Sequence, residues 1–198
     1  MVIKRDRTDS YYTFDNRALG NCYTVIDNDI TYHYEFQING MEALVLYDNI
    51  LHIKDAIAEF RKSNKHVVRF YNENRSFFLG FNEIQTFKLP IDILQPTKFF
   101  IDEDKYKAIE KYLENETFFL PVAIIDDEYV LLDGHARARY LIDNYQKMVE
   151  CYIDTFDVDT QNCVYIAKEN NLFKVKNMEI LPHEEYLEYL EQTGMNDH

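Results

Sequence analysis

Residues 129–140 have the sequence YVLLDGHARARY, and this stretch decides the fold that the sequence predicts. A hydrophobic strand runs into Asp133 and Gly134, and a helix begins at once with a histidine and two arginines in its first turns. The first backbone N–H groups of a helix have no partner within the helix, and the helix dipole places partial positive charge there. Gly134 can take a positive φ, and Arg137 can offer a planar charged fork to two phosphate oxygens. The junction therefore predicts an anion-binding site.

The elements expected around this junction follow a regular order. Leu89–Thr97 predicts a strand and a turn, and Asp102–Glu114 predicts a helix with Asp102 as its N-cap. Leu120–Ile125 predicts a strand before the junction, and Val149–Asp154 predicts a strand after the helix that the junction opens. Strands and helices therefore alternate along this part of the chain.

In the order and spacing of these elements, residues 88–157 resemble the ParB/sulfiredoxin-like domain, also described as the ParB-like nuclease domain. The resemblance covers roughly a third of the chain and implies a mixed sheet with helices. We therefore expect an α+β protein with three parts. Residues 1–87 would form an N-terminal layer rich in β-hairpins, residues 88–157 the ParB/sulfiredoxin-like domain, and residues 158–198 a C-terminal helical extension packed on it.

Within this superfamily the loop is most similar to that of the free serine kinases, which read Asp-Gly-His-His-Arg. Asp133, Gly134, His135 and Arg137 match that loop, and Ala136 replaces its second histidine. Sulfiredoxins instead carry a reactive cysteine in a Gly-Gly-Cys-His-Arg loop, and His135 stands in its place. The resemblance therefore implies phosphate chemistry and argues against sulfiredoxin chemistry.

A second turn of the kinases departs from their pattern here. They use the glutamate of a Pro-His-Glu turn as the base for the serine hydroxyl, whereas the corresponding turn is Pro96-Thr97-Lys98. A charged lysine cannot take that proton, which argues against serine phosphorylation by the same mechanism. Lys98 would suit phosphate neutralisation, or it would be a surface residue. Glu103 and Asp104 lie close enough in the sequence to replace the missing base.

ParB partition proteins carry a Gly-Glu-Arg-Arg loop, of which only Gly134 and Arg137 remain. They also continue into a basic helix-turn-helix region, whereas residues 158–198 are acidic. The net charge of −14 further argues against duplex DNA as a partner, because DNA affinity depends on neutralising many phosphates. A small anionic ligand or a nucleotide is the partner that we expect.

The resemblance implies catalytic roles for Asp133 and His135, as a base, a proton or phosphate contact, or a holder of Mg²⁺ brought by a nucleotide. A structural role stays open for each residue of the junction. Asp133 can cap the helix, His135 can be a structural histidine, and Arg137 can pair with Asp133 or a neighbouring acid. Arg139 is expected to be a solvated or structural charge. The expected phosphate or nucleotide contacts are Gly134, Ala136, Arg137, Thr97 and Lys98.

Other features bound the class of protein. Three widely spaced cysteines without a CxxC pair indicate reduced thiols of a cytoplasmic protein. The N-terminus has no apolar signal region, and no apolar run approaches a membrane span, so we expect a soluble protein. No metal site is expected, because His183-Glu184-Glu185 lacks a second histidine and Asp126-Asp127-Glu128 is typical of a solvated turn.

The flanking segments show no family resemblance. Residues 1–18 predict a loosely held arm, and Tyr186, Leu187, Tyr189 and Leu190 predict either the packed face of a terminal helix or a homodimer contact. The remaining expected elements are strands at 22–26, 30–38 and 41–47 with a turn at 39–40, a helix at 50–62, a hairpin of 67–71 with 76–81, and helices at 160–171 and 183–192.

Three functions from different classes follow. The leading hypothesis is a ParB-like protein that binds a nucleotide or small phosphorylated ligand at the Asp-Gly-His-Ala-Arg loop, with a phosphotransferase or small-molecule kinase and a nucleotide hydrolase as its candidate activities. The alternative is a non-catalytic regulatory or interaction protein that retains the fold, which the lysine at 98 and the alanine at 136 favour. The third is a nuclease, against which the negative charge argues.

Overall fold

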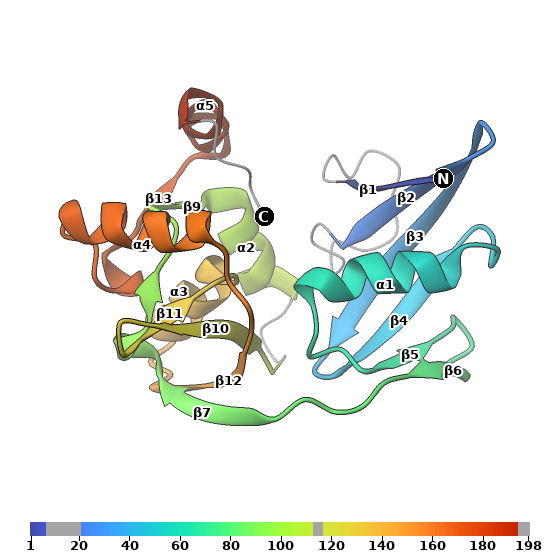
Figure 1. Ribbon diagram of the computed structural model, residues 1–198, viewed down its shortest axis with the longest axis horizontal. Coiled ribbons are helices and arrows are strands. Elements are labelled where there is room, and N and C mark those ends of the chain that lie inside the picture. The colour runs from blue at the N-terminus through green and yellow to red at the C-terminus, as the bar shows by residue number, and fades with distance from the viewer. Residues whose placement is uncertain (7–20, 113–116, 194–198) are drawn as a thin grey trace. The chain divides into compact units, whose positions relative to one another are not determined.

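The computed structural model describes residues 1–6, 21–112 and 117–193 (Figure 1). The chain forms two compact units, Met1–Ile84 and Gln85–His198. Both contain strands and helices, which confirms the predicted α+β class. Within the described residues, no helix is long and apolar enough to cross a membrane.

The first unit is a six-stranded sheet with one helix on its face. The strands stand in sequence order from β1 to β6, and all neighbours are antiparallel except β4 and β5. Helix α1 (Ile53–Ser63) connects that parallel pair and covers one face of the sheet (Figure 1). The strands are β1 (Val2–Asp6), β2 (Cys22–Asp27), β3 (Ile30–Asn39), β4 (Glu42–Tyr47), β5 (Arg69–Tyr71) and β6 (Phe77–Gly80).

The alternation along β3 builds the core of this unit, as predicted. Tyr32, Tyr34 and Phe36 are buried, and the ring of Phe36 stacks on Phe60 of α1 with centroids 4.2 Å apart. Ile30 shares their alternating spacing, but it lies at the first position of the strand and is 55% exposed. A strand end that extends past the covering helix has nothing to bury its side chain.

Several boundaries in this unit differ from the prediction, and the hairpin strands are shorter, at Arg69–Tyr71 and Phe77–Gly80. Residues 2–6 of the expected arm form β1, which pairs with β2, and residues 7–18 lie outside the described residues. Helix α1 begins at Ile53 instead of residue 50, because Asn49 Oδ1 accepts the N–H of Leu51 and closes a local turn first. The β3–β4 turn is Gly40–Met41 instead of 39–40, since Asn39 still pairs with Glu42 and Gly40 takes φ 60°.

The second unit contains a five-stranded mixed sheet in the order β7-β12-β10-β11-β8. A separate parallel pair, β9 with β13, carries two further helices at its ends. The strands are β7 (Thr86–Pro90), β8 (Gln95–Pro96), β9 (Phe100–Asp102), β10 (Phe119–Ile125), β11 (Glu128–Leu131), β12 (Met148–Ile153) and β13 (Glu179–Leu181). The helices are α2 (Glu103–Tyr112), α3 (His135–Asp143), α4 (Val158–Glu169) and α5 (His183–Thr193), with short 3-10 turns at Ile91–Ile93 and Val175–Asn177.

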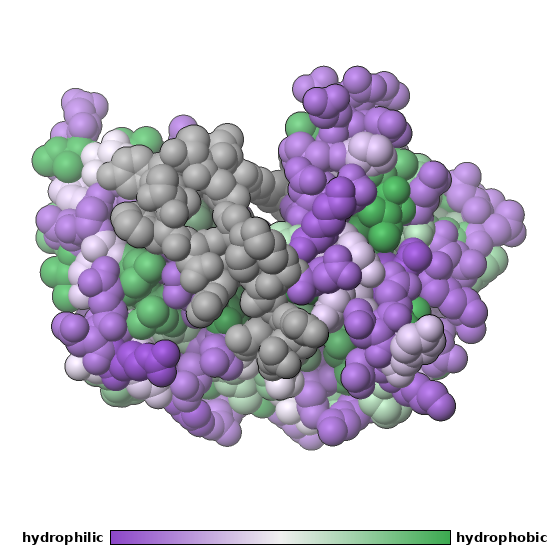
Figure 2. Space-filling view, turned by 180° about the vertical axis from the view of Figure 1, so that it is seen from behind, coloured by the Kyte–Doolittle hydropathy of each residue, from purple (hydrophilic) through white to green (hydrophobic). Residues whose placement is uncertain are grey.

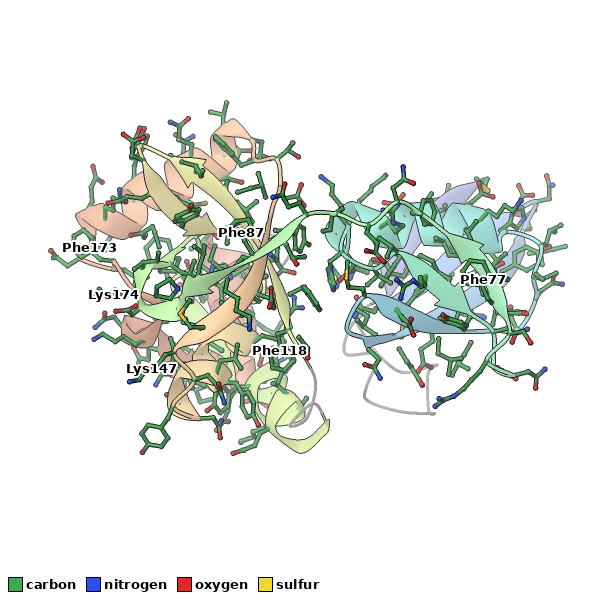
Figure 3. All side chains as sticks on the ribbon, turned by 90° about the horizontal axis from the view of Figure 1, so that it is seen from below. Phe77, Phe87, Phe118, Lys147, Phe173 and Lys174 are labelled. Atoms are coloured by element: carbon green, nitrogen blue, oxygen red, sulfur yellow. The ribbon has the colours of Figure 1, made fainter. Side chains whose placement is uncertain are left out.

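The core of this unit lies between the sheet and its helices. Leu120, Val122 and Leu131 of the sheet pack with Ala138 of α3 in one buried cluster. Phe87, labelled in Figure 3, covers the edge of this cluster with its ring 6.2 Å from that of Tyr129. These contacts hold α3 against the sheet and so position its first turn.

Side-chain caps mark the starts of α2 and α4. Helix α4 spans Val158–Glu169 instead of the predicted 160–171, because Asp157 Oδ1 accepts the N–H of Thr160 and caps the helix. Asp102 caps α2 as predicted, because its Oδ1 accepts the N–H of Asp104 at 3.0 Å. Residues 113 and 114 of the predicted helix lie outside the described residues. Tyr145 follows the helical spacing of the buried residues of α3, but the helix ends at Asp143. Tyr145 takes φ 60° in the following turn and its side chain is 92% exposed.

The turn at Asp126 and Asp127, between β10 and β11, and the packed face of α5 also bear on the predictions. Both aspartates take positive φ between β10 and β11, which confirms the predicted turn. On α5, Tyr186 is buried and Tyr189 packs edge-on against Phe100, with ring centroids 4.8 Å apart, whereas Leu187 is exposed. The two tyrosines therefore form a packed face within the unit.

Candidate functional site

Two sequence-distant segments meet at one edge of the second sheet. Strands β8 and β11 are parallel, and Pro96 pairs with Leu131. The two strands therefore end on the same side of the sheet, which places Thr97 and Lys98 beside Asp133 and the start of α3. Ligands of open sheets bind outside the carboxyl ends of parallel strands, where the chain turns into loops and helices. The structure thus brings the predicted residues of both segments together.

Gly134 makes the sharp turn between strand and helix. It is the N-cap of α3 with φ 81° and ψ 28°, a left-handed conformation that favours glycine. A Cβ at this position would lie 2.7 Å from Leu120 Cδ2 and 3.1 Å from Arg137 Nε. No side chain caps the helix here. The position needs glycine for its backbone angle and for the close approach of both side chains.

The Arg137 guanidinium folds back over this glycine toward the beginning of its own helix. Its Nη2 donates to Asp133 Oδ2 at 3.4 Å, so the ion pair expected as the alternative to anion binding is present. The contact is long and uses one donor of the fork. The remaining N–H groups of Arg137 make no hydrogen bond to the part of the chain that the structure describes. About a fifth of the side chain, 21%, is exposed.

Asp133 carries a negative charge among positive groups. Burial acts to raise the pKa of its carboxyl group, but Arg137, Lys98 and a backbone hydrogen bond from Gly134 outweigh burial and leave the pKa below its ordinary value. The side chain is 33% exposed, so solvent still reaches the carboxylate. Asp133 is therefore ionised at neutral pH and is held by both a cation and a main-chain N–H.

His135 is buried, and its ring connects the two segments. Its Nε2 lies 3.1 Å from the backbone nitrogen of Thr97, whose N–H donates to it. The Thr97 hydroxyl donates to the carbonyl of Leu131 at 2.9 Å and lies 3.2 Å from the same Nε2. Because Nε2 accepts an N–H, the imidazole is neutral and its proton is on Nδ1. The ring thus holds the loop after β8 against the start of α3.

The other predicted residues contribute charge and backbone. Lys98 is half-buried and lies close enough to Asp133 to lower the pKa of that carboxyl group. Ala136 packs its methyl group against the core cluster, so only its backbone faces the helix start. Arg139 donates to both Asp143 oxygens at 3.0 Å and to the carbonyl of Met178 at 2.7 Å, which confirms its structural role.

Sequence reasoning missed Tyr152 of β12. Burial raises the pKa of its hydroxyl, and the charges that act on that hydroxyl are those of Arg137, Asp154 and Asp133. The tyrosine is buried, and it pairs in register with Pro121, whose carbonyl accepts the N–H of Leu132 just before the loop. The only signal in the sequence was the alternation of β12, which cannot show that the charge of an arginine 15 residues earlier acts on its tyrosine.

Glu103 and Asp104, the two residues considered as a replacement for the base of the serine kinases, lie on the surface of α2. Glu103 pairs with Lys107 at 2.8 Å on the surface of α2, and Asp104 is exposed. Among residues 1–6, 21–112 and 117–193, no group of three His, Cys, Asp or Glu side chains is arranged to hold a metal ion. Mg²⁺ that arrives with a nucleotide needs only one or two carboxylates besides the phosphates, and the ionised Asp133 fits that mode.

Comparisons with known proteins do not assign this protein to a family. No protein-family model matches the sequence, and no curated protein matches it either. Among solved structures, the protein is similar to the crystal structure of protein Atu1540 from Agrobacterium tumefaciens. That likeness has a TM-score of 0.39 at 16% identity and covers 56% of this chain and 69% of the other. A TM-score this low carries no conclusion about fold or function.

Proposed function

We propose that this protein binds a nucleotide or another small phosphorylated ligand at the loop Asp133–Arg137, with Thr97 and Lys98 completing the site. The observation that carries the proposal is the guanidinium of Arg137, which lies over the helix start and engages Asp133 through one donor. A phosphate at this place would gain charge-assisted hydrogen bonds of about 1.5–3 kcal/mol each. Lys98 adds a second positive charge, which lowers the pKa of Asp133.

The second unit is an α+β fold with a mixed sheet, which agrees with the proposal. We propose the ParB/sulfiredoxin-like fold for residues 88–157 because the loop residues and the order of elements resemble that superfamily. Within it, phosphoryl transfer would need mainly positioning and charge neutralisation, which Arg137, Lys98 and backbone donors can provide. Asp133 would hold Mg²⁺ together with the phosphates of the ligand.

One observation favours the non-catalytic alternative. His135 is buried, and its Nε2 already accepts the N–H of Thr97, so this nitrogen cannot take a proton from a ligand without giving up that contact. Since Lys98 cannot serve as a base while charged, binding without turnover is the second candidate function. Under this alternative the bound ligand would regulate the protein instead of reacting.

A thermal-shift series with ADP, ATP, CTP and AMP, each with and without Mg²⁺, tests the binding proposal. A ligand at ~100 times its dissociation constant adds about 2.7 kcal/mol of stability. Arg137→Lys keeps the charge but removes the fork, so we expect it to abolish most of the shift. Lys147→Ala is a control for general charge effects, because it removes an exposed positive charge elsewhere on the same unit and should leave the shift unchanged (Figure 3).

Turnover then separates the candidate functions. Release of phosphate from the bound nucleotide would assign a hydrolase, and transfer to free serine or another hydroxyl compound would assign a kinase. Binding without either product would assign the regulatory alternative. If no nucleotide shifts the melting temperature of the unmodified protein, or if Arg137→Lys shifts as far as the unmodified protein, the proposed site is wrong.

A further inference from the structure

A second pair of side chains is brought together at the small parallel sheet of the second unit. Strands β9 and β13 run in parallel, and Leu181 pairs with Asp102. Each strand leads directly into a helix, α2 after Asp102 and α5 after Pro182. Asp102 and the first residue of α5, His183, therefore meet although they lie 81 positions apart. The pair involves none of the residues of the loop Asp133–Arg137.

The geometry orients the imidazole of His183. Its Nδ1 lies 3.1 Å and 3.0 Å from the two carboxylate oxygens of Asp102, one of which also accepts the N–H of Asp104. Asp102 is buried, whereas the His183 side chain is 45% exposed. A carboxylate only accepts hydrogen bonds, so Nδ1 is the donor. In the neutral ring the lone pair is then on Nε2, on the side of the ring away from Asp102.

We propose that Asp102 and His183 form a general-base dyad that takes a proton from water or another hydroxyl group while its oxygen attacks an uncharged or cationic acyl compound. In this step the O–H bond breaks and the proton binds to Nε2. The electron pair of the oxygen forms the new bond to the acyl carbon, and the leaving group departs with the electron pair of its own bond. The protonated imidazole is positively charged, and the Asp102 carboxylate balances that charge. Asp102 also holds the ring in place, as the group that orients a catalytic base does.

The surrounding charges select the class of substrate. Asp104 in the first turn of α2 and Glu184 and Glu185 in the first turn of α5 are all exposed acids next to the pair. The face of α5 seen in Figure 2 is mostly hydrophilic. Lys105, whose Nζ lies 5.9 Å from the Tyr186 ring centroid, is a nearby cation, but the three carboxylates outnumber it. The net negative potential repels anions and attracts cations. The dyad and the loop Asp133–Arg137 thus differ in the sign of the charge that they favour.

The pair also joins the starts of two helices, and this structural role has to be separated from reactivity. Asp102→Asn is suited to that purpose, because asparagine is as good an N-cap as aspartate and keeps α2 capped. The asparagine side chain can both donate and accept, so it no longer forces the lone pair onto Nε2. A purely structural pair would leave the chemistry of His183 unchanged in this variant.

The first test is labelling with diethyl pyrocarbonate, which acylates an unprotonated imidazole nitrogen and releases ethyl carbonate. Site-resolved mass spectrometry should show that His183 reacts faster than His33, which is paired with Asp48 at 2.9 Å but is only 18% exposed. The rate at His183 should fall several-fold in Asp102→Asn, while the rate at His33 should not change. Equal rates at His183 in both proteins would overturn the proposal.

The second test measures proton removal from water and the charge preference. Hydrolysis of succinimidyl acetate, a neutral activated ester, should be accelerated by the protein and should lose most of that acceleration in His183→Gln. The hydrolysis rate of each ester with the protein is divided by its rate with free imidazole, which corrects for the different reactivity of the two esters. By this ratio the sulfonated, anionic form of the same ester should be accelerated less. An unchanged rate in His183→Gln would refute the base, and equal acceleration of both esters would refute the proposed substrate class.

Discussion

Replacing Gly134 by alanine tests the strand–helix junction on which the candidate site depends. Its φ of 81° is left-handed, and an alanine there costs ~1–2 kcal/mol. The added Cβ would also lie 2.7 Å from Leu120 Cδ2, and Leu120 is fully buried among its neighbours. Overpacking of that kind costs about 1–3 kcal/mol. We therefore expect Gly134→Ala to lower the free energy of unfolding by roughly 2–5 kcal/mol.

Urea denaturation followed by circular dichroism measures this change, and Gly80→Ala is the control. A Cβ on Gly80 would lie 2.9 Å from Phe77 Cζ, but Gly80 has no positive φ and the Phe77 ring is 59% exposed (Figure 3). The ring can move into solvent, so the change should stay within about 0.5 kcal/mol. A loss of less than about 1 kcal/mol for Gly134→Ala would refute the assigned backbone geometry and packing.

Three further predictions use the titrating groups. Burial raises the pKa of Cys151 to about 12, so iodoacetamide at pH 8 should label the partly exposed Cys163 first; faster labelling of Cys151 would contradict its burial. Burial and a hydrogen bond to Asp143 raise the pKa of Tyr106 to about 12. Its stabilisation is therefore complete below pH 10 and is lost as the pH rises toward 12, so Tyr106→Phe should unfold with a flatter pH dependence in that range. The lowered pKa of Asp133 has the opposite sign: its stabilisation is present above pH 3.8 and is lost as the pH falls further, which acid titration of Asp133→Asn should show as a smaller loss.

Local patterns predicted much of the fold because short-range physics controls them. The alternation of β3 placed Tyr34 and Phe36 in the core, and the cap at Asp102 marked the start of α2. Errors arose where a tertiary or very local contact overrode the periodicity. Asn49 delays the start of α1 by closing a turn, and Tyr145 leaves the helical stripe because α3 has already ended.

The candidate site was predictable only in part. Gly134 and Arg137 lie in one short segment, so their meeting at a helix start follows from strand–glycine–helix geometry. The neutral state of His135 could not be inferred, because it depends on the N–H of Thr97, which lies 38 positions away. The effect of the Arg137 charge on the pKa of Tyr152 likewise depends on the order of strands in the sheet.

The amino-acid sequence alone determined which residues turn, which alternate and which carry charge, since those properties depend on neighbours within a few positions. Tertiary structure decided which of them meet. The parallel pairing of β8 with β11 set the partners of His135, and that of β9 with β13 placed His183 on Asp102. Strand pairing is a long-range contact whose partners depend on the burial of the whole sheet, and for that reason no local pattern contains it.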